Sequence, residues 1–284
     1  MTRRATVWMV AAVALCAVAG VWRWRALHVA DPAGVVIAGG DGGGLPRTDP
    51  ALEGFDVQAL QLAARAALAQ GASALLIMRH GHLVLEQYAG GADANTPVDG
   101  GELADALLMV AAGIAVTKHG MSMPPPPLDA VRLAAAIAGA SGLSYPLFLS
   151  RHVWQPLNAA PARWLSPGVS ARAGDWLRVA ELLLHDGRFE GTQVAPPGWL
   201  ARHASRLSGL GTEPLSVDGV SGLRGPGATR LWLVPRFDVA ILRVASAPAP
   251  GTTVDEALAH TIISALRDRP ATGGTSLSDL VPGH

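Results

Sequence analysis

Residues 74–88 read ALLIMRHGHLVLEQY. Ala74–Met78 and Leu83–Tyr88 are apolar runs, and the short segment RHGH separates them. Two such runs around a short connection that contains glycine predict a β-hairpin. His80 and His82 in the connection could ligate a metal, but the sequence places no third ligand beside them. We therefore interpret both histidines as exposed turn residues.

A second hairpin is predicted near the other end of the chain. Leu231–Val234 and Val239–Leu242 flank a turn that begins with Pro235. One helix is predicted before the first hairpin, over residues 56–70, and another after the second, over residues 254–266. Strand pairs at both ends with helices between them predict a mixed α/β (α+β) fold, in which both ends of the domain build one antiparallel sheet.

The segment between the hairpins is predicted to form a mostly helical lobe. Helical patterns cover residues 103–117, 128–140, 145–154 and 175–185. The first of these is nearly all apolar and ends near Gly120, which predicts a buried helix.

An acidic pair opens that buried helix. Residues 97–116 read PVDGGELADALLMVAAGIAV, and Glu102 and Asp105 precede the apolar run. Acids three residues apart lie on one helix face, and two nearby carboxylates can share a proton as an acid–base pair. Acids in a first turn also stabilise the helix dipole, by about 0.3–1 kcal/mol. The second interpretation is favoured, and the first stays open.

Composition restricts the class of function. Lys+Arg and Asp+Glu both number 22 and only 15% of residues are charged, which gives no electrostatic case for nucleic-acid binding. Cys16 is the single cysteine, so neither a disulfide framework nor a thiolate metal site can form. We expect no cofactor and no metal.

The N-terminus predicts a membrane segment over residues 1–24. Arginines flank the uncharged stretch 5–22, whose 18 residues span about 27 Å as a helix, close to the roughly 30 Å of a hydrocarbon core. Ala17-Val18-Ala19 also fits a signal-peptide cleavage site. A retained anchor is favoured over a cleaved signal. Both predict an exported, periplasmic or otherwise extracytoplasmic domain, with the membrane as a partner of the anchored form.

Several segments, in this order along the chain, resemble the β-lactamase-related serine hydrolases. That family includes class C β-lactamases, penicillin-binding-protein-like esterases and 6-aminohexanoate-dimer hydrolases. The resembling segments are residues 74–88, 111–116, 154–157, 175–188 and 225–235. The resemblance implies a β-lactamase-like fold and a hydrolase site with three motifs. These are Ser-x-x-Lys at a helix N-terminus, Tyr-x-Asn, and Lys/His-x-Gly on a strand.

The chain departs from all three motifs. No serine stands three residues before its single lysine, Lys118, and neither of its two tyrosines begins a Tyr-x-Asn. In register with the family, Glu102 and Asp105 take the Ser and Lys positions. Pro125 falls at the Tyr position, and Arg224 at the Lys/His position.

The resemblance and the departures together predict the organisation and the function. Residues 25–53 are predicted as a linker, 54–269 as a shortened β-lactamase-like domain, and 270–284 as a flexible tail. We expect a degenerate site that binds a small molecule or a protein partner. The alternatives are an active serine hydrolase or amidase, and a hydrolase that uses carboxylates instead. We also expect the Arg224 guanidinium to pair with Glu102 or Asp105.

Overall fold

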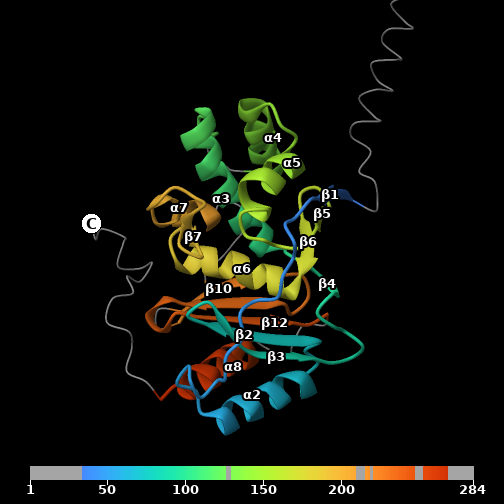
Figure 1. Cartoon of the computed structure of the whole chain (residues 1–284), viewed down its shortest axis with the longest axis vertical. Helices are drawn as coiled ribbons and strands as arrows, with labels where there is room; N and C mark the ends of the chain where they lie inside the picture. Colours follow the sequence, from blue (N-terminus) through green and yellow to red (C-terminus); the bar gives the residue numbers. More distant parts are fainter. Residues whose placement is uncertain (1–33, 126–128, 209–214, 218–219, 247–251, 268–284) are drawn as a thin grey trace, which may run out of the picture.

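The computed structural model describes residues 34–125, 129–208, 215–217, 220–246 and 252–267 (Figure 1). The predicted membrane segment and the predicted tail lie outside these residues. Within the described ranges no single helix is both long and apolar enough to cross a membrane. One pair, Ala130–Ser141 with Tyr145–Trp154, meets the length and composition criteria only jointly, across a bend of 72°.

A six-stranded antiparallel sheet forms the centre of the molecule, in the order β3-β2-β12-β11-β10-β9. Its strands are β2 (Ala74–Arg79), β3 (His82–Tyr88), β9 (Leu215–Val217), β10 (Val220–Arg224), β11 (Arg230–Val234) and β12 (Val239–Val244). The predicted N-terminal hairpin is β2–β3, and β2 pairs with β12 from the C-terminal hairpin. The predicted antiparallel sheet built from both ends of the domain is therefore present.

Helices cover both faces of this sheet. Figure 1 shows α2 (Val57–Ala69) and α8 (Thr252–Ser264) below the sheet and α6 (Ala173–Leu184) above it. Alternate residues of β12 face opposite sides of the sheet. Val239 and Ile241 pack in the cluster between the sheet and the helices α2 and α8. Ala240 and Leu242 belong to the larger core on the opposite side. Because β12 is buried on both faces, residues 239–242 read as a continuous apolar run.

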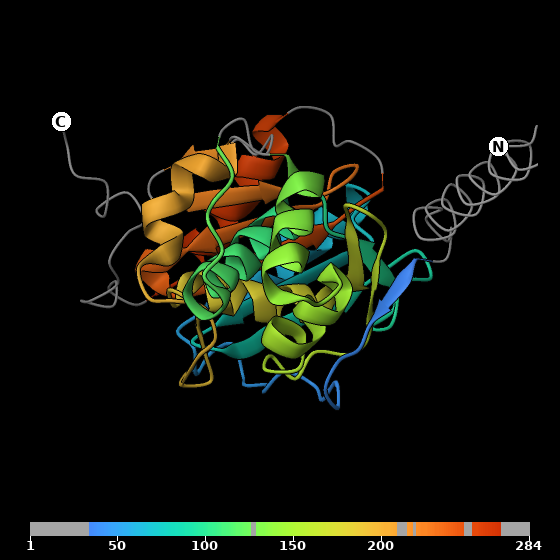
Figure 2. The same ribbon diagram turned by 90° about the horizontal axis from the view of Figure 1, so that it is seen from above.

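The predicted helical lobe lies over α6, as Figures 1 and 2 show. It contains α3 (Glu102–His119), α4 (Ala130–Ser141), α5 (Tyr145–Leu149), a π-helical turn (Ser150–Trp154) and α7 (Trp199–Ser208). Twelve residues of α3 are buried, and the helix ends at Gly120 in the left-handed conformation, as predicted. The sequence did not predict α7.

A second, smaller sheet lies beside the lobe in the order β1-β5-β6-β4. Its strands are β1 (Val35–Ile37), β4 (Pro97–Asp99), β5 (Ala162–Trp164) and β6 (Val169–Arg172), and a separate short hairpin joins β7 (Arg188–Phe189) to β8 (Thr192–Gln193). β1 belongs to the stretch predicted as a linker. The described part of that stretch packs on the domain, with Ile37 fully buried and Gly40 N–H donating to the Ala159 carbonyl at 2.9 Å.

Candidate functional site

The N-terminus of α3 meets the end of β10 through closely packed glycines. Gly101 precedes α3 at φ +53°, and a Cβ there would lie 2.9 Å from the carbonyl oxygen of Arg224. The same Cβ would lie 3.0 Å from the Cα of Gly225, whose own Cβ would lie 2.7 Å from Thr229 Cγ2 and 3.4 Å from the Asp99 carbonyl oxygen. Glycine is therefore needed for the backbones of the helix start and the strand end to approach this closely.

Glu102, the first residue of α3, joins the helix to the strand. Its Oε2 accepts a hydrogen bond of 2.6 Å from the backbone N–H of Arg224. An ionised acceptor makes such a bond stronger than a neutral one, and a carboxylate in a first turn also stabilises the helix dipole. The half-buried Glu102 side chain thus occupies the space between the helix start and the strand end.

Asp105 lies one turn further along the same helix and is also half-buried. Burial, and secondarily the charge of Glu102, raise the pKa of Asp105 to about 6. Two carboxylates with different environments can divide into a proton acceptor and a proton donor. Asp105 therefore holds a proton more readily near neutral pH than an ordinary aspartate does.

Tyr145 is the polar residue near this pair that the sequence did not identify. It begins α5, is buried, and packs its ring edge-on against Trp164 at 4.8 Å between centroids. Burial, followed by the charge of Asp105, raises its pKa well above the ordinary value. Tyr145 therefore remains a neutral phenol close to Asp105. It belongs to no Tyr-x-Asn motif, so motif analysis excluded it.

Arg224 lies beside Glu102 and contacts it through the backbone. Its backbone N–H donates to Glu102 Oε2. The guanidinium Nε is buried and has no hydrogen-bond partner, and the pairing of this guanidinium with Glu102 or Asp105 stays a prediction. The close approach at Gly101 brings the Glu102 carboxylate to the strand backbone. Arg224 also faces Arg230 across the strand pair, which concentrates positive charge here.

The remaining predicted positions lie in different surroundings. Pro125 is exposed in the segment after α3 and carries no N–H donor. Lys118 is in the last turn of α3, 16 residues beyond Glu102 (118 − 102). That separation is about 24 Å along the helix. The structure thus brings Glu102, Asp105 and Arg224 together, and the lysine cannot act beside them.

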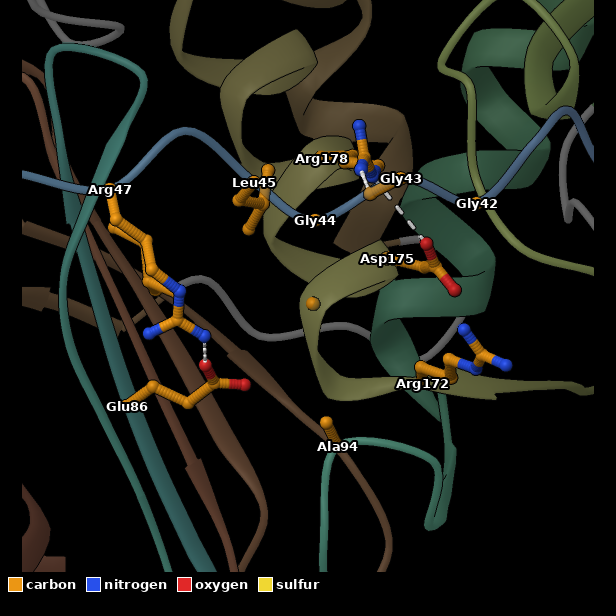
Figure 3. Close-up of a pocket in the computed structure, with 12 residues that line it drawn as sticks. Gly42, Gly43, Gly44, Leu45, Arg47, Glu86, Ala94, Arg172, Asp175 and Arg178 are labelled. Carbon is orange, nitrogen blue, oxygen red and sulfur yellow. Dashed lines mark hydrogen bonds and ion pairs between the residues drawn. The ribbon is translucent and has the colours of Figure 1, made fainter.

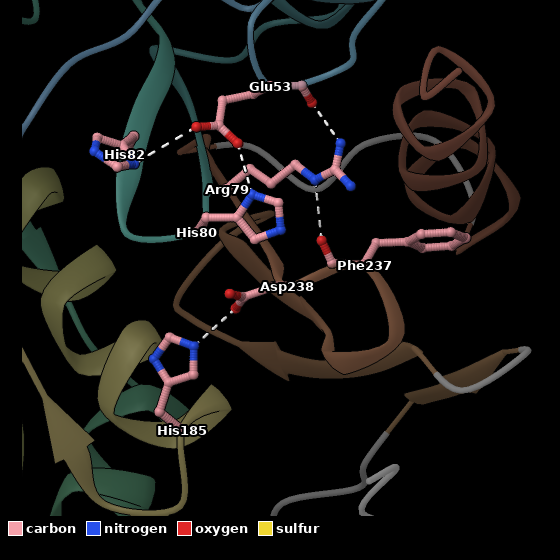
Figure 4. Close-up of polar contacts among 7 residues, drawn as sticks. All are labelled: Glu53, Arg79, His80, His82, His185, Phe237 and Asp238. Atoms are coloured by element: carbon pink, nitrogen blue, oxygen red, sulfur yellow. Dashed lines mark hydrogen bonds and ion pairs between the residues drawn. The ribbon is translucent and has the colours of Figure 1, made fainter. Parts of the chain in front are cut away.

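A second polar cluster joins three turns on another part of the molecule (Figure 4). Glu53 contacts His80 Nδ1 at 2.7 Å and His82 Nδ1 at 3.5 Å, and His185 Nε2 lies 2.9 Å from Asp238 Oδ1. Within the ranges that the structure describes, no group of three or more His, Cys, Asp or Glu side chains could hold a metal ion. The two hairpin histidines, about half exposed, anchor the turn to Glu53.

The antiparallel sheet, the helices on both its faces and the helix start seated at a strand end are the architecture of the β-lactamase-like hydrolases. No protein-family model matches the chain. One curated relative is the 6-aminohexanoate-dimer hydrolase of Paenarthrobacter ureafaciens. It is 28% identical over 153 aligned residues, which cover 42% of this chain and 38% of that protein. The match thus spans well under half of the relative's length.

Solved structures show the same fold at low sequence identity. A Bacillus anthracis protein, provisionally assigned as a 6-aminohexanoate-dimer hydrolase, has a TM-score of 0.61 at 15% identity, over 86% of this chain and 93% of that one. A provisionally assigned β-lactamase from Bacteroides dorei has a TM-score of 0.57 at 13% identity, over 74% and 99%. The resemblance to the β-lactamase-related serine hydrolases is thereby confirmed, and the chain has their fold.

Proposed function

We propose that this chain is a catalytically degenerate member of the β-lactamase-related serine hydrolases that binds a ligand or regulates a partner. One observation carries the proposal: Glu102 stands at the first position of α3 and accepts the Arg224 backbone N–H. In the β-lactamase-related serine hydrolases that this chain resembles, the corresponding helix position holds the serine nucleophile. A carboxylate that is hydrogen-bonded to the neighbouring strand leaves no hydroxyl to activate.

The lysine base of a Ser-x-x-Lys pair is also missing from the start of α3. Such a lysine acts one helical turn from its serine, where its amine reaches the hydroxyl. Asp105 occupies that turn, and Lys118 lies about 24 Å away. Removal of a nucleophile and its base takes away most of the rate enhancement of such a site.

The acidic pair also changes which ligands the site favours. Glu102 and Asp105 place carboxylates where the family holds a serine and a lysine, while Arg224 and Arg230 keep positive charge on the neighbouring strands. The ligand that fits this proposal is therefore neutral or cationic only at the end that faces α3.

We further propose that the domain is exported and tethered to a membrane. Support comes from the sequence alone, from the uncharged stretch 5–22 between arginines. Fractionation of cells that express the full chain, with alkaline extraction of the membranes, tests this. Release of the intact domain into the soluble fraction would favour a cleaved signal peptide.

Active-site probes test the degenerate site. We expect neither a fluorophosphonate nor a fluorescent penicillin to label the purified full-length chain. The matched variant is E102S/D105K, which rebuilds Ser-x-x-Lys on the same turn. Labelling of this variant but not of the wild type would attribute the loss to these two residues. Labelling of a serine in the wild-type chain would instead establish an active serine hydrolase.

The raised pKa of Asp105 favours a second candidate, a hydrolase with carboxylate chemistry. Asp105 as proton donor and ionised Glu102 as acceptor would form an acid–base pair. Hydrolysis of simple esters or amides should then change with an inflection near pH 6. Loss of that turnover in both D105N and E102Q, with survival in serine-to-alanine variants, would support this candidate over the first.

A further inference from the structure

A small cleft opens between the start of α6, the Gly42–Gly44 segment and β3 (Figure 3). Its volume is about 130 Å³. With a liquid share of about 30 Å³ per water molecule, this equals roughly four waters. The size suits a compound as small as glycine, alanine or serine.

Asp175 supplies a buried carboxylate oxygen with no partner in this cleft. Its side chain is only 6% exposed, and Oδ1 accepts the Ala160 N–H at 3.1 Å and lies 3.5 Å from Arg178 Nε. Oδ2 is buried and has no hydrogen-bond partner. An unsatisfied buried carboxylate oxygen is costly, so this atom favours a donor supplied by a ligand.

Positive charge lies beside that oxygen. Arg47, Arg172 and Arg178 line the cleft together with two carboxylates, Glu86 and Asp175, which leaves one net positive charge (3 − 2). Arg47 pairs with Glu86, and Arg178 with Asp175 Oδ1, while the charge of Arg172 acts on the carboxylates of Asp175 and Asp93.

The Asp175 carboxylate and the Arg172 guanidinium give the cleft an acidic end and a basic end. Figure 3 shows the free oxygen of Asp175 and the guanidinium of Arg172 turned toward each other. The start of α6 adds positive potential to the Arg172 end, since the helix has no side-chain N-cap and Gly174 lines the cleft.

We propose that this cleft binds a free amino acid of small side chain. Its ammonium group donates to Asp175 Oδ2, and its carboxylate contacts Arg172 and the start of α6. A carboxylate without an ammonium leaves Asp175 unsatisfied, and an amine without a carboxylate leaves Arg172 and the helix start without their anion. This site is independent of the proposed function, because none of its residues belongs to the α3–β10 junction.

Calorimetric titration of the full-length chain in detergent micelles tests the proposal. The probes are alanine, lactate, ethylamine and inorganic phosphate. We expect saturable binding of alanine, with lactate and ethylamine weaker by about tenfold or more. No saturable alanine binding means that water alone satisfies Asp175, and phosphate binding without alanine binding means a simple anion site. Equal affinity for lactate removes the role of Asp175. Each of these three results overturns the proposal.

Variants locate the site. G174L fills the cleft, because the nearest atom to a Cβ at Gly174 is Leu45 Cδ1 at 4.0 Å, and it should abolish alanine binding. R172Q should weaken binding by about tenfold or more, and R65Q, an exposed arginine on α2, should leave it unchanged. Unchanged affinity in folded G174L would overturn the assignment. Both variants leave Asp175 intact, so the test does not depend on the folding of D175N.

Discussion

At the scale of single residues, Gly101 is the position where the junction tolerates least change. Its φ of +53° and the 2.9 Å approach of Arg224 O to its Cβ position both exclude a side chain. We predict that G101A lowers the free energy of unfolding by about 2–4 kcal/mol. Urea denaturation followed by tryptophan fluorescence measures this change.

A matched glycine provides the control for that measurement. Gly139 lies inside α4 with no atom within 4 Å of a Cβ position. Alanine is the better helix former, so G139A should stabilise the chain by about 0.5–1 kcal/mol. If both variants shifted the midpoint in the same direction, the steric account of Gly101 would be wrong.

The protonation of Asp105 couples the acidic pair to stability. Its pKa in the folded chain is about 6, against 3.8 for the ordinary carboxyl, so the folded state binds more protons between these values. Stability therefore falls as pH rises from about 3.8 through 6 and stays reduced above that range. Allowing for solvent screening of the partly exposed side chain, the penalty is about 1–2 kcal/mol.

We predict that D105N removes this penalty. The variant should be more stable than the wild type by about 1–2 kcal/mol at pH 8 and about equal to it at pH 3.5. Urea unfolding at the two pH values measures the difference. D99N, which makes the same change at an exposed carboxylate on β4, is the matched control. A D105N effect of equal size at both pH values would contradict a titration origin.

Residue-level prediction from the sequence reached the neighbourhood of the site but not its contacts. Register with a family placed Glu102, Asp105 and Arg224 near one another. The backbone hydrogen bond from Arg224 depends on the Gly101 conformation and the close approach at Gly225, which no side-chain pattern encodes. Tyr145 is near Asp105 only through the packing of α5 on the lobe, so no local signal could identify it.

At the scale of elements, the contact between α3 and α7 depends on a glycine in mid-helix. A Cβ at Gly113 would lie 2.7 Å from the Trp199 indole, which also donates to the Met109 carbonyl at 2.9 Å. We predict that G113A destabilises the chain by about 1–3 kcal/mol, although alanine is the better helix former.

A double-mutant cycle tests whether the clash with Trp199 is the cause. W199L alone should destabilise, because it leaves a void and removes the bond to Met109. In G113A/W199L the added methyl has room, so the double variant should be more stable than the sum of the two single changes predicts. Strict additivity would show that G113A acts through something other than this contact.

Elements with strong local signals were predicted well, and the others depend on pairing. Asp56 caps α2 by accepting from the N–H groups of Gln58 and Ala59, and glycines end α3 and α4, all visible in the sequence. The strands of the small sheet are only three or four residues long, too short for an alternating pattern to identify them. Their formation depends on partners far apart in the chain, which periodicity cannot reveal.

At the scale of the whole molecule, the two ends of the domain are joined by several independent contacts. Asp56 N–H donates to the Ala265 carbonyl at 2.6 Å, and Arg267 N–H donates to the Gly54 carbonyl at 2.9 Å. α2 packs against α8 beneath the same sheet face. Neither end can therefore complete its buried surface without the other.

The contacts that stabilise the fold are distinct from the residues at the start of α3 that would carry any chemistry. Apolar contacts of the larger core hold α3, and the start of this helix approaches β10 at Gly101. None of these contacts requires a serine or a lysine at the helix start. A chain can therefore retain this architecture with other residues at the helix start, and the fold alone does not establish activity.

The pairing of strands from the two ends of the domain also predicts how the sheet exchanges its amide hydrogens. β2 and β12 are neighbours in the middle of the sheet, are buried on both faces and come from opposite ends of the domain. We predict that amides in residues 74–79 and 239–244 exchange with solvent hydrogen only through global unfolding, with equal opening free energies. β1 is a sheet-edge strand with exposed Val35 and Val36, so its amides should exchange through local opening at much lower free energy. Native-state hydrogen exchange of the full-length chain at increasing urea, read by mass spectrometry, measures all three segments. Lower protection of residues 239–244 than of 74–79 would mean that the C-terminal hairpin opens separately. That result would contradict the prediction that β2 and β12 open together.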